Sequence, residues 1–401
     1  MALFSLCSSE SSAQDRSGSI PIVNLMSEDE SIMALRWVGR LIVGLIGLAI
    51  LFVLVLKVIL GPQFQKPVVQ LARPRLPYFS HVVVITMENH GDKILSNNPQ
   101  AKYINQLMNT WGFDTNYFGV THVSLPNYVA LLSGSTGGTH SDSPLQRFHQ
   151  MSLPQELNQA KISWQAVMES IPSPGFNGNW YPDHLSKNTA PIVPPPDALY
   201  AKKHNPFALF PALNKSRPDH TINLTQFRHE LASGHIAQFT WITPNLCHDM
   251  HGQASGPGAS CPTSNPTLLI ENGNHFLQQL IPEIIHSPGW NSHSVIFLTW
   301  DETNDPTNFL SPTDLRAYLA PGPEAPVIPV ADIAIGGGKV PLLVLYGRHP
   351  HPLRVNLWAD HYSVLKTIED SWDLPYLGHA QDADVPVLTP FFSEKKTSST
   401  R

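Results

Sequence analysis

The sequence predicts an α/β fold in which a mostly parallel central sheet carries helices on both faces, preceded by one membrane-spanning helix. Short β-branched runs alternate with helical patterns between residues 81 and 371, which is typical of a parallel sheet. An uncharged apolar stretch at residues 41–56 comes before this alternation. Carboxylate, amide and imidazole side chains follow three of the predicted strands, at the edge of the sheet where ligands of such folds bind.

Residues 1–35 are predicted to be a disordered tail, because most of them lie in a region rich in Ser, Asp and Glu. Residues 36–60 are predicted to form a single transmembrane helix. Residues 41–56 carry no charge and residues 58–60 extend the apolar run past Lys57, which approaches the about 20 residues that span a bilayer. An acidic tail before a long apolar core does not fit a cleaved signal peptide. The apolar residues surround the helix, whereas a buried core helix has one apolar face.

The charges around this span do not fix its orientation. Basic residues lie on both sides of it, with Arg36 and Arg40 before it and Lys57, Lys66, Arg73 and Arg75 after it. By the positive-inside rule their number leans slightly toward a cytoplasmic C-terminus. The net charge of −6 and the lack of a Lys/Arg-rich run predict that the protein does not bind nucleic acid.

The rest of the chain is predicted to be one folded domain between two irregular segments. Residues 61–79 form a Pro-rich, semi-rigid spacer, residues 80–392 form the domain, and residues 393–401 form a disordered tail. We expect strands at residues 81–87, 236–242, 294–299 and 340–346. We expect helices at residues 100–111, 126–132, 223–232, 266–285 and 359–371, with Asn223 as an N-cap. Residues 170–218 are predicted to be a long loop, and residues 336–338 a turn.

Three predicted strands end in side chains of the types that bind metal ions. These are Glu88, Asn89 and His90 after the first strand, Asp301 and Glu302 after the strand at 294–299, and Asn245, His248, Asp249 and His251 after the strand at 236–242. Such oxygen and nitrogen ligands bind hard or borderline divalent cations. An Asp–Glu pair alone is usually a solvated turn, and a His-rich segment is usually a surface loop. The prediction of a metal site therefore depends on their coincidence at one edge of the sheet.

Ser124 is predicted to be the nucleophile. It begins the run Ser124-Leu-Pro-Asn-Tyr128, and Pro126 suits the first turn of a helix, which places Ser124 at the helix N-terminus. The free N–H groups and the positive dipole end there favour a phosphate. A metal ion bound to the hydroxyl would lower its pKa and activate it. A serine in this place is more often a simple N-cap, and the ligands at the strand ends are what favour the nucleophile.

Five motifs occur in order along the folded domain. They are Met87-Glu-Asn89, Ser124-Leu-Pro-Asn-Tyr128, Asn245-Leu-Cys-His-Asp-Met-His251, Thr299-Trp-Asp-Glu302 and His361-Tyr-Ser-Val-Leu-Lys-Thr-Ile-Glu369. Together they resemble the phosphoesterase family of bacterial acid phosphatases and phospholipases C. The resemblance covers about residues 81–392 and is greatest to the short acid phosphatase branch, which includes phosphatidylinositol 3-phosphate phosphatases. It implies an alkaline-phosphatase-like fold and a single-pass membrane protein whose C-terminal domain lies outside the cytoplasm.

The resemblance also implies roles for individual residues. The positions that hold the catalytic divalent metal ion match Glu88, Asn89, Asp301 and Glu302, with Ser124 completing the set. The serine motif is also similar to the Thr-Phe-Pro-Asn-His segment of nucleotide pyrophosphatases, whose threonine is the nucleophile. The phosphate pocket would be lined by His122 and His251, as catalytic residues, and by Asn127, His204, Asp249 and His361, as substrate-binding residues. Some of these could carry a second metal ion.

Three positions depart from the family pattern. Glu302 stands where distant relatives have Asp-His or Asp-Asp, Asn274 stands where relatives often have an acid, and Gly252 stands where an aspartate is expected. These departures leave the identity and the number of the metal ions open. They do not remove the nucleophile or a predicted metal ligand.

The predicted activity is metal-dependent hydrolysis of phosphate monoesters through a phosphoserine on Ser124, with pocket histidines giving a proton to the leaving alkoxide. A phospholipase C or phosphodiesterase acting on lipid head groups is the first alternative, because a membrane anchor suits a lipid substrate. A catalytically inactive, membrane-tethered phosphate-binding protein is the second, and the intact site residues argue against it. The expected partners are a phosphate ester or phospholipid and the membrane itself.

Two cysteines lie in the folded domain, because Cys7 belongs to the tail. Cys247 and Cys261 flank a Gly/Ser/Pro-rich loop. Their spacing permits a disulfide and equally permits two unpaired thiols, so the sequence leaves both open.

Overall fold

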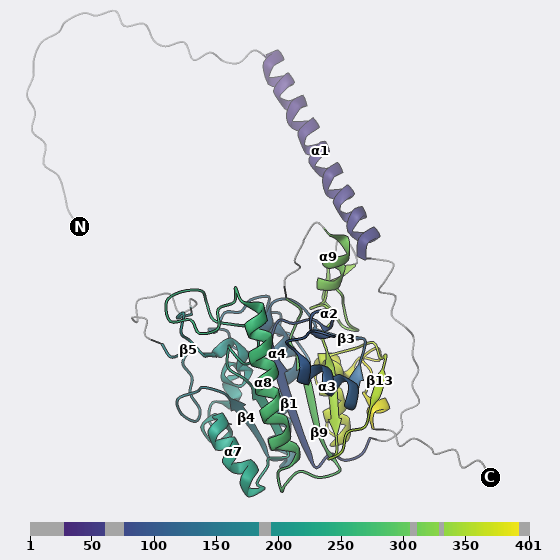
Figure 1. Cartoon of the computed structure of the whole chain (residues 1–401). Coiled ribbons are helices and arrows are strands. Elements are labelled where there is room, and N and C mark those ends of the chain that lie inside the picture. Colours follow the sequence, from purple (N-terminus) through teal and green to yellow (C-terminus); the bar gives the residue numbers. More distant parts are fainter. Residues whose placement is uncertain (1–27, 61–75, 184–193, 305–310, 329–332, 393–401) are drawn as a thin grey trace, which may run out of the picture. The chain divides into compact units, whose positions relative to one another are not determined.

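The computed structural model describes residues 28–60, 76–183, 194–304, 311–328 and 333–392 (Figure 1). The chain divides into two compact units, Met1–Val55 and Leu56–Arg401. Most of the predicted tail at residues 1–35, most of the predicted spacer at residues 61–79 and all of the predicted tail at residues 393–401 lie outside the described residues.

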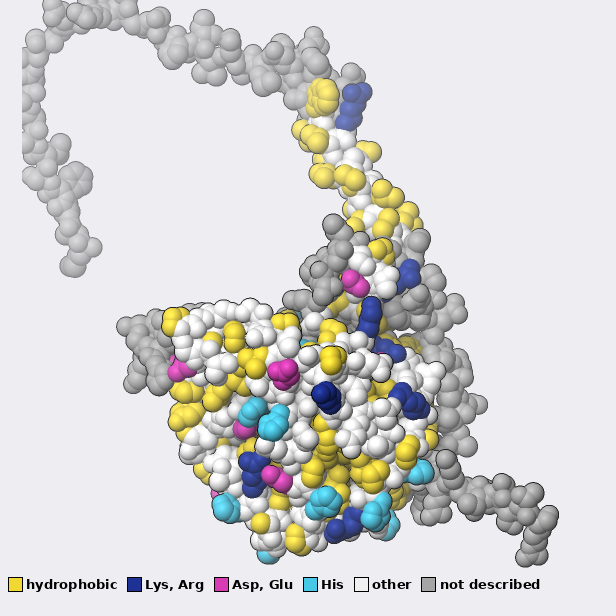
Figure 2. Space-filling model, in the orientation of Figure 1, with side chains coloured by type: hydrophobic (Ala, Val, Ile, Leu, Met, Phe, Trp, Pro, Cys, Tyr) yellow, Lys and Arg dark blue, Asp and Glu magenta, His cyan; other side chains and the backbone are white. Residues whose placement is uncertain are grey.

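Helix α1 (Glu28–Leu60) covers the residues that were predicted to cross a membrane. Its apolar side chains are largely exposed over residues 41–55 (Figure 2). In the part of the chain that the structure describes, no helix is both long enough and apolar enough to cross a bilayer. The predicted transmembrane helix is therefore not supported. The location of the C-terminal domain outside the cytoplasm stays a prediction from sequence.

The folded domain is built on an eight-stranded sheet in the order β13-β2-β12-β9-β1-β8-β4-β7. Its strands are β1 (His81–Met87), β2 (Gly112–Asp114), β4 (Trp164–Met168), β7 (Thr221–Ile222), β8 (Phe239–Thr243), β9 (Ser294–Trp300), β12 (Leu342–Tyr346) and β13 (Leu353–Val355). Of these eight, β12 alone runs antiparallel to both of its neighbours. The predicted mostly parallel sheet is therefore confirmed, and the four predicted strands correspond to β1, β8, β9 and β12.

The central strands are buried on both faces of the sheet. Every side chain of β9 is buried, as is every side chain of β1 after His81. Because successive side chains point to opposite faces, both faces of these strands must be covered. β1 pairs in parallel with β8 and β9, and Ile85 lies opposite Ile242 on one side and Leu298 on the other. This register places the carboxyl ends of the three strands side by side.

The longer helices form two packed groups. They are α3 (Lys102–Thr110), α4 (Ser124–Ser133), α5 (Leu153–Ala160), α7 (Leu224–Ser233), α8 (Pro266–Ile285) and α10 (His361–Ser371). Helices α3 and α7 pack against α8, which lies in front of the sheet in Figure 1, whereas α4 packs against α5 and α10. Each predicted helix is present. Asn223 caps α7 as predicted, accepting a hydrogen bond from the Gln226 N–H at 2.9 Å.

The sequence did not predict the short elements. The predicted loop at residues 170–218 contains β5 (Trp180–Tyr181), β6 (Tyr200–Ala201), α6 (Arg217–His220) and the 3-10 helices η2 (Lys202–His204), η3 (Pro206–Leu209) and η4 (Pro211–Leu213). Elsewhere there are α2 (Asp92–Leu95), β3 (Tyr117–Phe118), α9 (Pro312–Tyr318), β10 (Val327–Ile328), β11 (Ile333–Ala334), β14 (Ala359–Asp360), η5 (Gly378–Gln381) and η6 (Thr389–Phe391). Segments this short do not establish a period of 2 or 3.6 residues.

Asp114 places a buried carboxyl at the end of β2. Its Oδ1 accepts hydrogen bonds from the N–H groups of Asn116, at 2.9 Å, and Leu357, at 3.1 Å, while Oδ2 has no partner among the described residues. Burial raises the pKa of Asp114 to about 7, although the two N–H groups and Lys339 act to lower it. The folded protein therefore keeps this carboxyl neutral at pH values where an unfolded aspartate is ionised.

The free energy of unfolding should fall as the pH rises from about 4 to about 7, because the unfolded chain releases the Asp114 proton first. In Asp114→Asn the side chain is neutral at every pH. The free energy of unfolding of Asp114→Asn, relative to that of the wild type, should thus increase from about pH 4 to about pH 7, by up to about 4 kcal/mol. Urea unfolding at about pH 4 and about pH 8 measures the change, with the exposed Asp373→Asn as control. A stability difference that does not vary with pH would contradict the raised pKa.

Candidate active site

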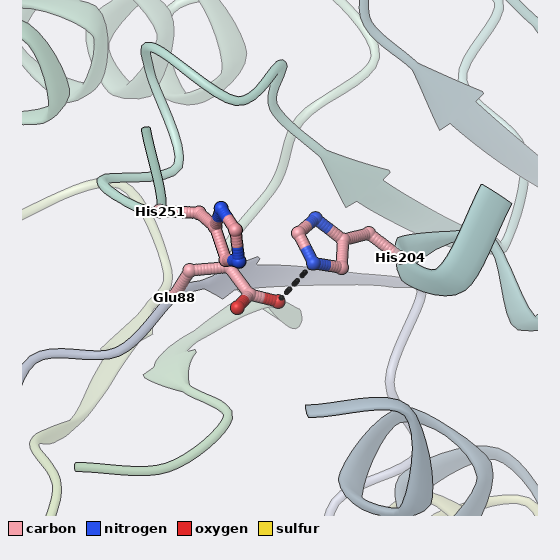
Figure 3. A group of neighbouring side chains, drawn as sticks. All are labelled: Glu88, His204 and His251. Carbon is pink, nitrogen blue, oxygen red and sulfur yellow. Dashed lines mark ion pairs between the residues drawn. The ribbon is translucent and has the colours of Figure 1, made fainter. Parts of the chain in front are cut away.

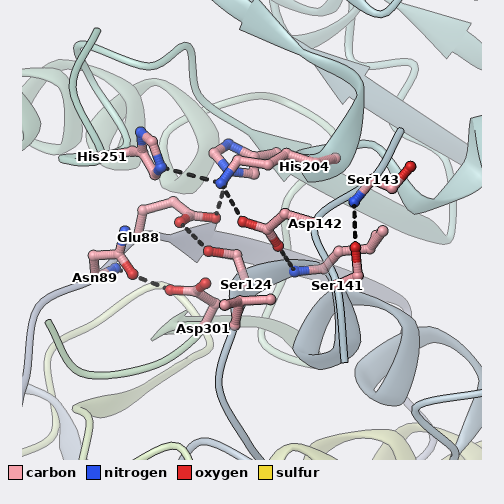
Figure 4. A network of polar contacts seen from close by, with 12 residues as sticks. Glu88, Asn89, Ser124, Ser141, Asp142, Ser143, His204, His251 and Asp301 are labelled. Atoms are coloured by element: carbon pink, nitrogen blue, oxygen red, sulfur yellow. Dashed lines mark hydrogen bonds and ion pairs between the residues drawn. The ribbon is translucent and has the colours of Figure 1, made fainter. Parts of the chain in front are cut away.

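Acidic and amide residues from three neighbouring strands meet at the carboxyl edge of the sheet. Glu88 and Asn89 follow β1, Asp301 and Glu302 follow β9, and Asp249 follows β8. The Glu88 N–H donates to the Asp249 carbonyl at 2.8 Å, and the Asn89 N–H donates to Asp301 Oδ1 at 2.9 Å. Hydrogen bonds thus tie the three strand ends together, and Figure 4 shows Asn89 beside Asp301.

Ser124 is the first residue of α4, and its hydroxyl points into this group (Figure 4). Ser124 Oγ donates to Glu88 Oε2 at 2.9 Å and lies 3.3 Å from Glu302 Oε1. The side chain is buried. The structure therefore brings the predicted nucleophile into direct contact with two of the predicted metal ligands.

Asn127 holds the loop that leads into α4. Its Oδ1 accepts hydrogen bonds from the N–H groups of Val120, at 2.8 Å, and Thr121, at 3.1 Å. Its Nδ2 donates to the carbonyls of Thr121, at 2.7 Å, and Val123, at 3.0 Å. These four bonds use the full capacity of the amide. Asn127, which was predicted to bind substrate, thus positions the loop carrying Ser124 and has no donor or acceptor left for a ligand.

The predicted turn at residues 336–338 packs beneath the same loop. The Gly337 N–H donates to the Gly119 carbonyl at 3.0 Å, and the Gly337 carbonyl accepts from the Thr303 N–H at 2.8 Å. A Cβ atom on Gly337 would lie 2.5 Å from the Thr121 carbonyl oxygen. Glycine is therefore required for the turn to approach the loop so closely.

Burial raises the pKa of four carboxyl groups in this cluster. The pKa of Asp301 rises to about 8, first through burial and then through the negative charge of Glu302. Burial likewise raises the pKa values of Glu88, Asp249 and Glu302, and the charge of Asp301 adds to the effect on Glu88 and Asp249. Carboxylates this close together do not all ionise unless a positive charge compensates them.

The oxygen atoms of the cluster fit a divalent cation. Within the described residues, Asp301 Oδ2 is buried and makes no hydrogen bond, and Glu88 Oε1 is buried and faces the His204 ring at 3.1 Å. Buried carboxylate oxygens without partners are costly, and together with hydroxyl and amide oxygens they form the donor set that hard cations bind. A cation there would also offset the repulsion that raises the pKa values. The predicted metal ligands Glu88, Asn89, Ser124, Asp301 and Glu302 thus include oxygen atoms of the kind that such an ion binds, and the assignment stays a prediction.

His204 lies between the carboxyls of Glu88 and Asp249, and Figure 3 shows its ring beside Glu88. Its Nε2 is 3.1 Å from Glu88 Oε1, and its Nδ1 is 3.1 Å from Asp249 Oδ2. Burial lowers the pKa of His204 well below its usual range, and the charges of Lys203 and His251 add to this. A neutral imidazole ring carries one hydrogen, so it can donate to only one of the two carboxyls. The other carboxyl must carry a proton of its own to form a hydrogen bond with the ring. One donor atom each from Glu88, His204 and His251 lies within 4.8 Å of the others, a spacing that one metal ion could span.

His251 is fixed by hydrogen bonds on both sides of its ring. Its Nδ1 lies 2.8 Å from the Gly252 carbonyl, and Lys203 Nζ donates to its Nε2 at 3.1 Å. Burial lowers the pKa of His251 to about 3, and the charge of Lys203 lowers it further. These contacts assign the ring hydrogen to Nδ1. The backbone N–H of His251 also donates to Asp249 Oδ1 at 2.7 Å.

Two other predicted pocket histidines orient the carboxylate pair after β9. His122 Nδ1 pairs with Glu302, its Nε2 donates to the Tyr318 carbonyl at 2.8 Å, and its ring stacks on Tyr318. Burial acts to lower the pKa of His122, but the hydrogen bond and charge of Glu302 outweigh it and raise the pKa. His361 Nε2 donates to the Asp301 carbonyl at 2.6 Å, and its Nδ1 contacts a buried tyrosine hydroxyl. His361 therefore helps to fix the position of Asp301, and His122 helps to fix that of Glu302.

Lys203 and Asp142 belong to the same network, although the sequence did not single them out. Lys203 Nζ donates to Asp142 Oδ2 at 2.7 Å, and Asp142 Oδ1 accepts from the Leu125 N–H at 2.9 Å. Lys203 directly precedes His204, and that neighbourhood was a usable signal. Asp142 lies in a Ser-Asp-Ser run that carries no pattern.

A disulfide closes the loop that carries Asp249 and His251. Of the two alternatives that the sequence left open, the structure has Cys247 and Cys261 bonded, with their Cα atoms 5.5 Å apart. The Gln253 N–H donates to the Cys261 carbonyl at 2.8 Å. The cross-link limits the freedom of a segment that is otherwise rich in Gly, Ser and Pro.

The chain is similar to known phosphoesterases. A model of the Phosphoesterase family matches residues 95–375. The chain is 27% identical over 267 residues to the phosphate-repressible acid phosphatase of Penicillium chrysogenum, covering 66% of this chain and 52% of that one. It is 24% identical over 348 residues to the phosphatidylinositol-3-phosphatase of Mycobacterium tuberculosis, covering 86% of this chain and 94% of that one.

The extent of these matches differs between relatives. The chain spans about half the length of the fungal and yeast acid phosphatases that it matches. Among solved structures it is similar to a protein of the alkaline phosphatase superfamily from Vibrio parahaemolyticus, with a TM-score of 0.46 and 11% identity. That match covers 84% of this chain and 79% of the other.

Cation binding should stabilise the folded protein. Adding a divalent cation to chelator-treated protein should raise its Tm, because the ion binds the folded cluster and relieves its repulsion; a concentration of about 100 times Kd gives about 2.7 kcal/mol. In Asp301→Asn the rise should be lost, and the metal-free variant should be at least as stable as the metal-free wild type. Thermal melts with Mg²⁺, Ca²⁺, Mn²⁺ and Zn²⁺ measure this, with Glu271→Gln on the exposed face of α8 as control. If none of the four ions shifts the wild-type Tm, the metal assignment is wrong.

Proposed function

This chain belongs to the Phosphoesterase family, and from that premise we propose that it hydrolyses phosphate monoesters at Ser124. The observation that carries the proposal is the placement of the Ser124 hydroxyl at the start of α4, hydrogen-bonded to Glu88 and within reach of Glu302. A buried serine with carboxylates to take its proton, beside oxygen atoms that fit a cation, is suited to nucleophilic attack on phosphorus.

Five residues would hold the divalent metal ion. They are Glu88, Asn89, Ser124, Asp301 and Glu302, the set predicted from the resemblance. The ion would supply positive charge next to the reacting phosphate and lower the pKa of the Ser124 hydroxyl. The other residues of the cluster would orient these ligands and move protons.

The proposed reaction has two displacements. In the first, Ser124 Oγ forms a bond to phosphorus while the bond from phosphorus to the leaving oxygen breaks, and the hydroxyl proton passes to Glu88 Oε2, 2.9 Å away. The leaving alkoxide takes a proton from the pair formed by Lys203 Nζ and His251 Nε2, which already share one hydrogen across 3.1 Å. In the second, water attacks phosphorus, its proton returns to that pair, and Ser124 leaves with the proton held by Glu88.

His122, the other predicted proton donor, takes no part in this scheme. Both of its ring nitrogens are engaged, one by Glu302 and one by the Tyr318 carbonyl. Its partners are acceptors, so they cannot resupply a proton that the ring gives away. We propose that His122 positions Glu302.

The proposed substrate class is the phosphate monoesters. Relatives are named acid phosphatase and phosphatidylinositol-3-phosphatase, and the 3-phosphate of that lipid is a monoester. A diesterase or phospholipase C would instead prefer bis-p-nitrophenyl phosphate or an intact phospholipid. An inactive phosphate-binding protein would bind phosphate and release no alcohol.

Ser124→Ala should lower kcat on p-nitrophenyl phosphate by at least about a thousandfold, because the nucleophile is removed. Folding should be unaffected, since the methyl group fits the space of the hydroxymethyl group. Steady-state assays on p-nitrophenyl phosphate, bis-p-nitrophenyl phosphate, phosphatidylinositol 3-phosphate and a phosphatidylcholine measure both the loss and the preference. Ser133→Ala, in the last turn of α4, is the control. An unchanged rate in Ser124→Ala would remove Ser124 from the mechanism, and a preference for diesters would favour the alternative.

His251→Gln should affect substrates according to their leaving groups. Phenolate, the leaving group of phenyl phosphate, is basic and must be protonated as it departs. On this substrate kcat should therefore fall by about a hundredfold, as for loss of a general acid. On p-nitrophenyl phosphate, whose leaving group is stable as an anion, the loss should be much smaller. The exposed His275→Gln on α8 is the control. Equal losses on both substrates would show that His251 does not act through the leaving group.

A further inference from the structure

Lys203 places a buried ammonium group inside a cluster of carboxylates. Nζ donates to Asp142 Oδ2 at 2.7 Å and to His251 Nε2 at 3.1 Å, and the side chain is 10% exposed. Burial acts to lower the pKa of Lys203, but the charges of Asp142 and Glu88 outweigh it and raise the pKa. Lys203 therefore carries a positive charge when the substrate binds.

The charge of Lys203 acts on the groups that surround the Ser124 hydroxyl. It opposes the rise that burial causes in the pKa values of Glu88 and Glu302, the two carboxyls within reach of Ser124 Oγ. Asp142, which holds the ammonium, also accepts the N–H of Leu125, the residue after the nucleophile. One side chain thus links Lys203 to the first turn of α4.

The N-terminus of α4 has fewer free backbone N–H groups for a phosphate than the sequence predicted. The Leu125 N–H is already bonded to Asp142 Oδ1 at 2.9 Å, and Pro126 has no N–H. Two of the first three positions of the helix therefore have no hydrogen to give. A phosphate at Ser124 needs another donor, and Lys203 is the cationic side chain that Asp142 links to this helix end.

A second metal ion at His251 would compete with Lys203. The candidate second group consists of Glu88, His204 and His251. In His251, Nδ1 faces the Gly252 carbonyl and Nε2 accepts from Lys203 Nζ, so neither nitrogen is open to an ion while the lysine is in place. The ammonium thus occupies the position that the second ion would need.

We propose that Lys203 binds a non-bridging oxygen of the substrate phosphate and makes the site select dianionic monoesters over monoanionic diesters. An ammonium group has three hydrogens, and among the described residues Asp142 and His251 take two of them. The third can reach an acceptor on the phosphate at Ser124. A monoester carries two negative charges and three non-bridging oxygens, whereas a diester carries one charge and two such oxygens. The inference rests on the proposed hydrolysis at Ser124.

The test separates phosphate binding from turnover. In the Ser124→Ala background, calorimetric titration with inorganic phosphate measures affinity, and elemental analysis measures metal content. Adding Lys203→Met should weaken phosphate binding about tenfold or more, the size expected for a hydrogen bond to a charged group. With Ser124 restored, Lys203→Met should also lower the ratio of kcat/KM for p-nitrophenyl phosphate to that for bis-p-nitrophenyl phosphate by about tenfold. Lys203→Arg should recover part of both.

Lys202→Met is the matched control. Lys202 is the preceding buried lysine of the same short helix, and its Nζ donates to the Asn177 carbonyl at 3.4 Å. Phosphate affinity and the substrate ratio should be unchanged in it. If Lys203→Met and Lys203→Gln fold and retain the wild-type metal content but keep wild-type affinity and ratio, the proposal is overturned and Lys203 only balances the carboxylates. Should Lys203→Met fail to fold, Lys203→Gln, which can still donate to Asp142, decides the question alone.

A failure of the inference can be told apart from a failure of the proposed function. If the wild type does not hydrolyse p-nitrophenyl phosphate, the proposed function is wrong, and the phosphate titration still reports on Lys203. If the wild type is active and Ser124→Ala is not, an unchanged titration in the Lys203 variants overturns the inference alone.

Discussion

Four buried carboxyl groups at adjoining strand ends must share a small volume, and the rest of the site is arranged around their repulsion. Parallel pairing of β8, β1 and β9 brings these ends to one edge, and hydrogen bonds from the N–H groups of Glu88 and Asn89 lock them there. Burial and mutual charge raise the pKa values of the group. The arrangement is therefore unfavourable when all four groups are ionised, and a bound cation would stabilise it. Affinity for a cation follows from the same repulsion.

Three polar side chains near Ser124 are fully used in contacts within the protein. Asn127 makes four bonds to the loop before α4, His361 binds the Asp301 carbonyl, and His122 is held between Glu302 and Tyr318. These bonds fix the nucleophile and the carboxylates before any ligand arrives. Such preorganisation matters in charge-stabilising sites, since groups that must move at the moment of reaction lose part of their effect.

The sequence predicted the parts that depend on long patterns and missed those that depend on local geometry. β1 and α8 were predicted at their observed bounds, because buried strands and amphipathic helices leave a periodic signal. The gathering of Glu88, Asp249 and Asp301 followed from parallel pairing alone. Asn127 was predicted to bind substrate, because nothing in a motif shows whether an amide faces a ligand or its own loop. Asp142 was missed because its partners, Leu125 and Lys203, become neighbours only through folding.

The pairing of Asp142 with Lys203 resolves a conflict at the nucleophile. A carboxylate bonded to the first turn of α4 stabilises the helix, since it meets the positive end of the dipole. The same carboxylate would repel a phosphate arriving at Ser124. An ammonium on its second oxygen removes that repulsion and presents N–H donors in place of lone pairs. A proton on Asp142 would also remove its negative charge, but it would supply no cation to bind the substrate. A lysine lets Asp142 stay bonded to the helix and still provides positive charge for an anionic substrate.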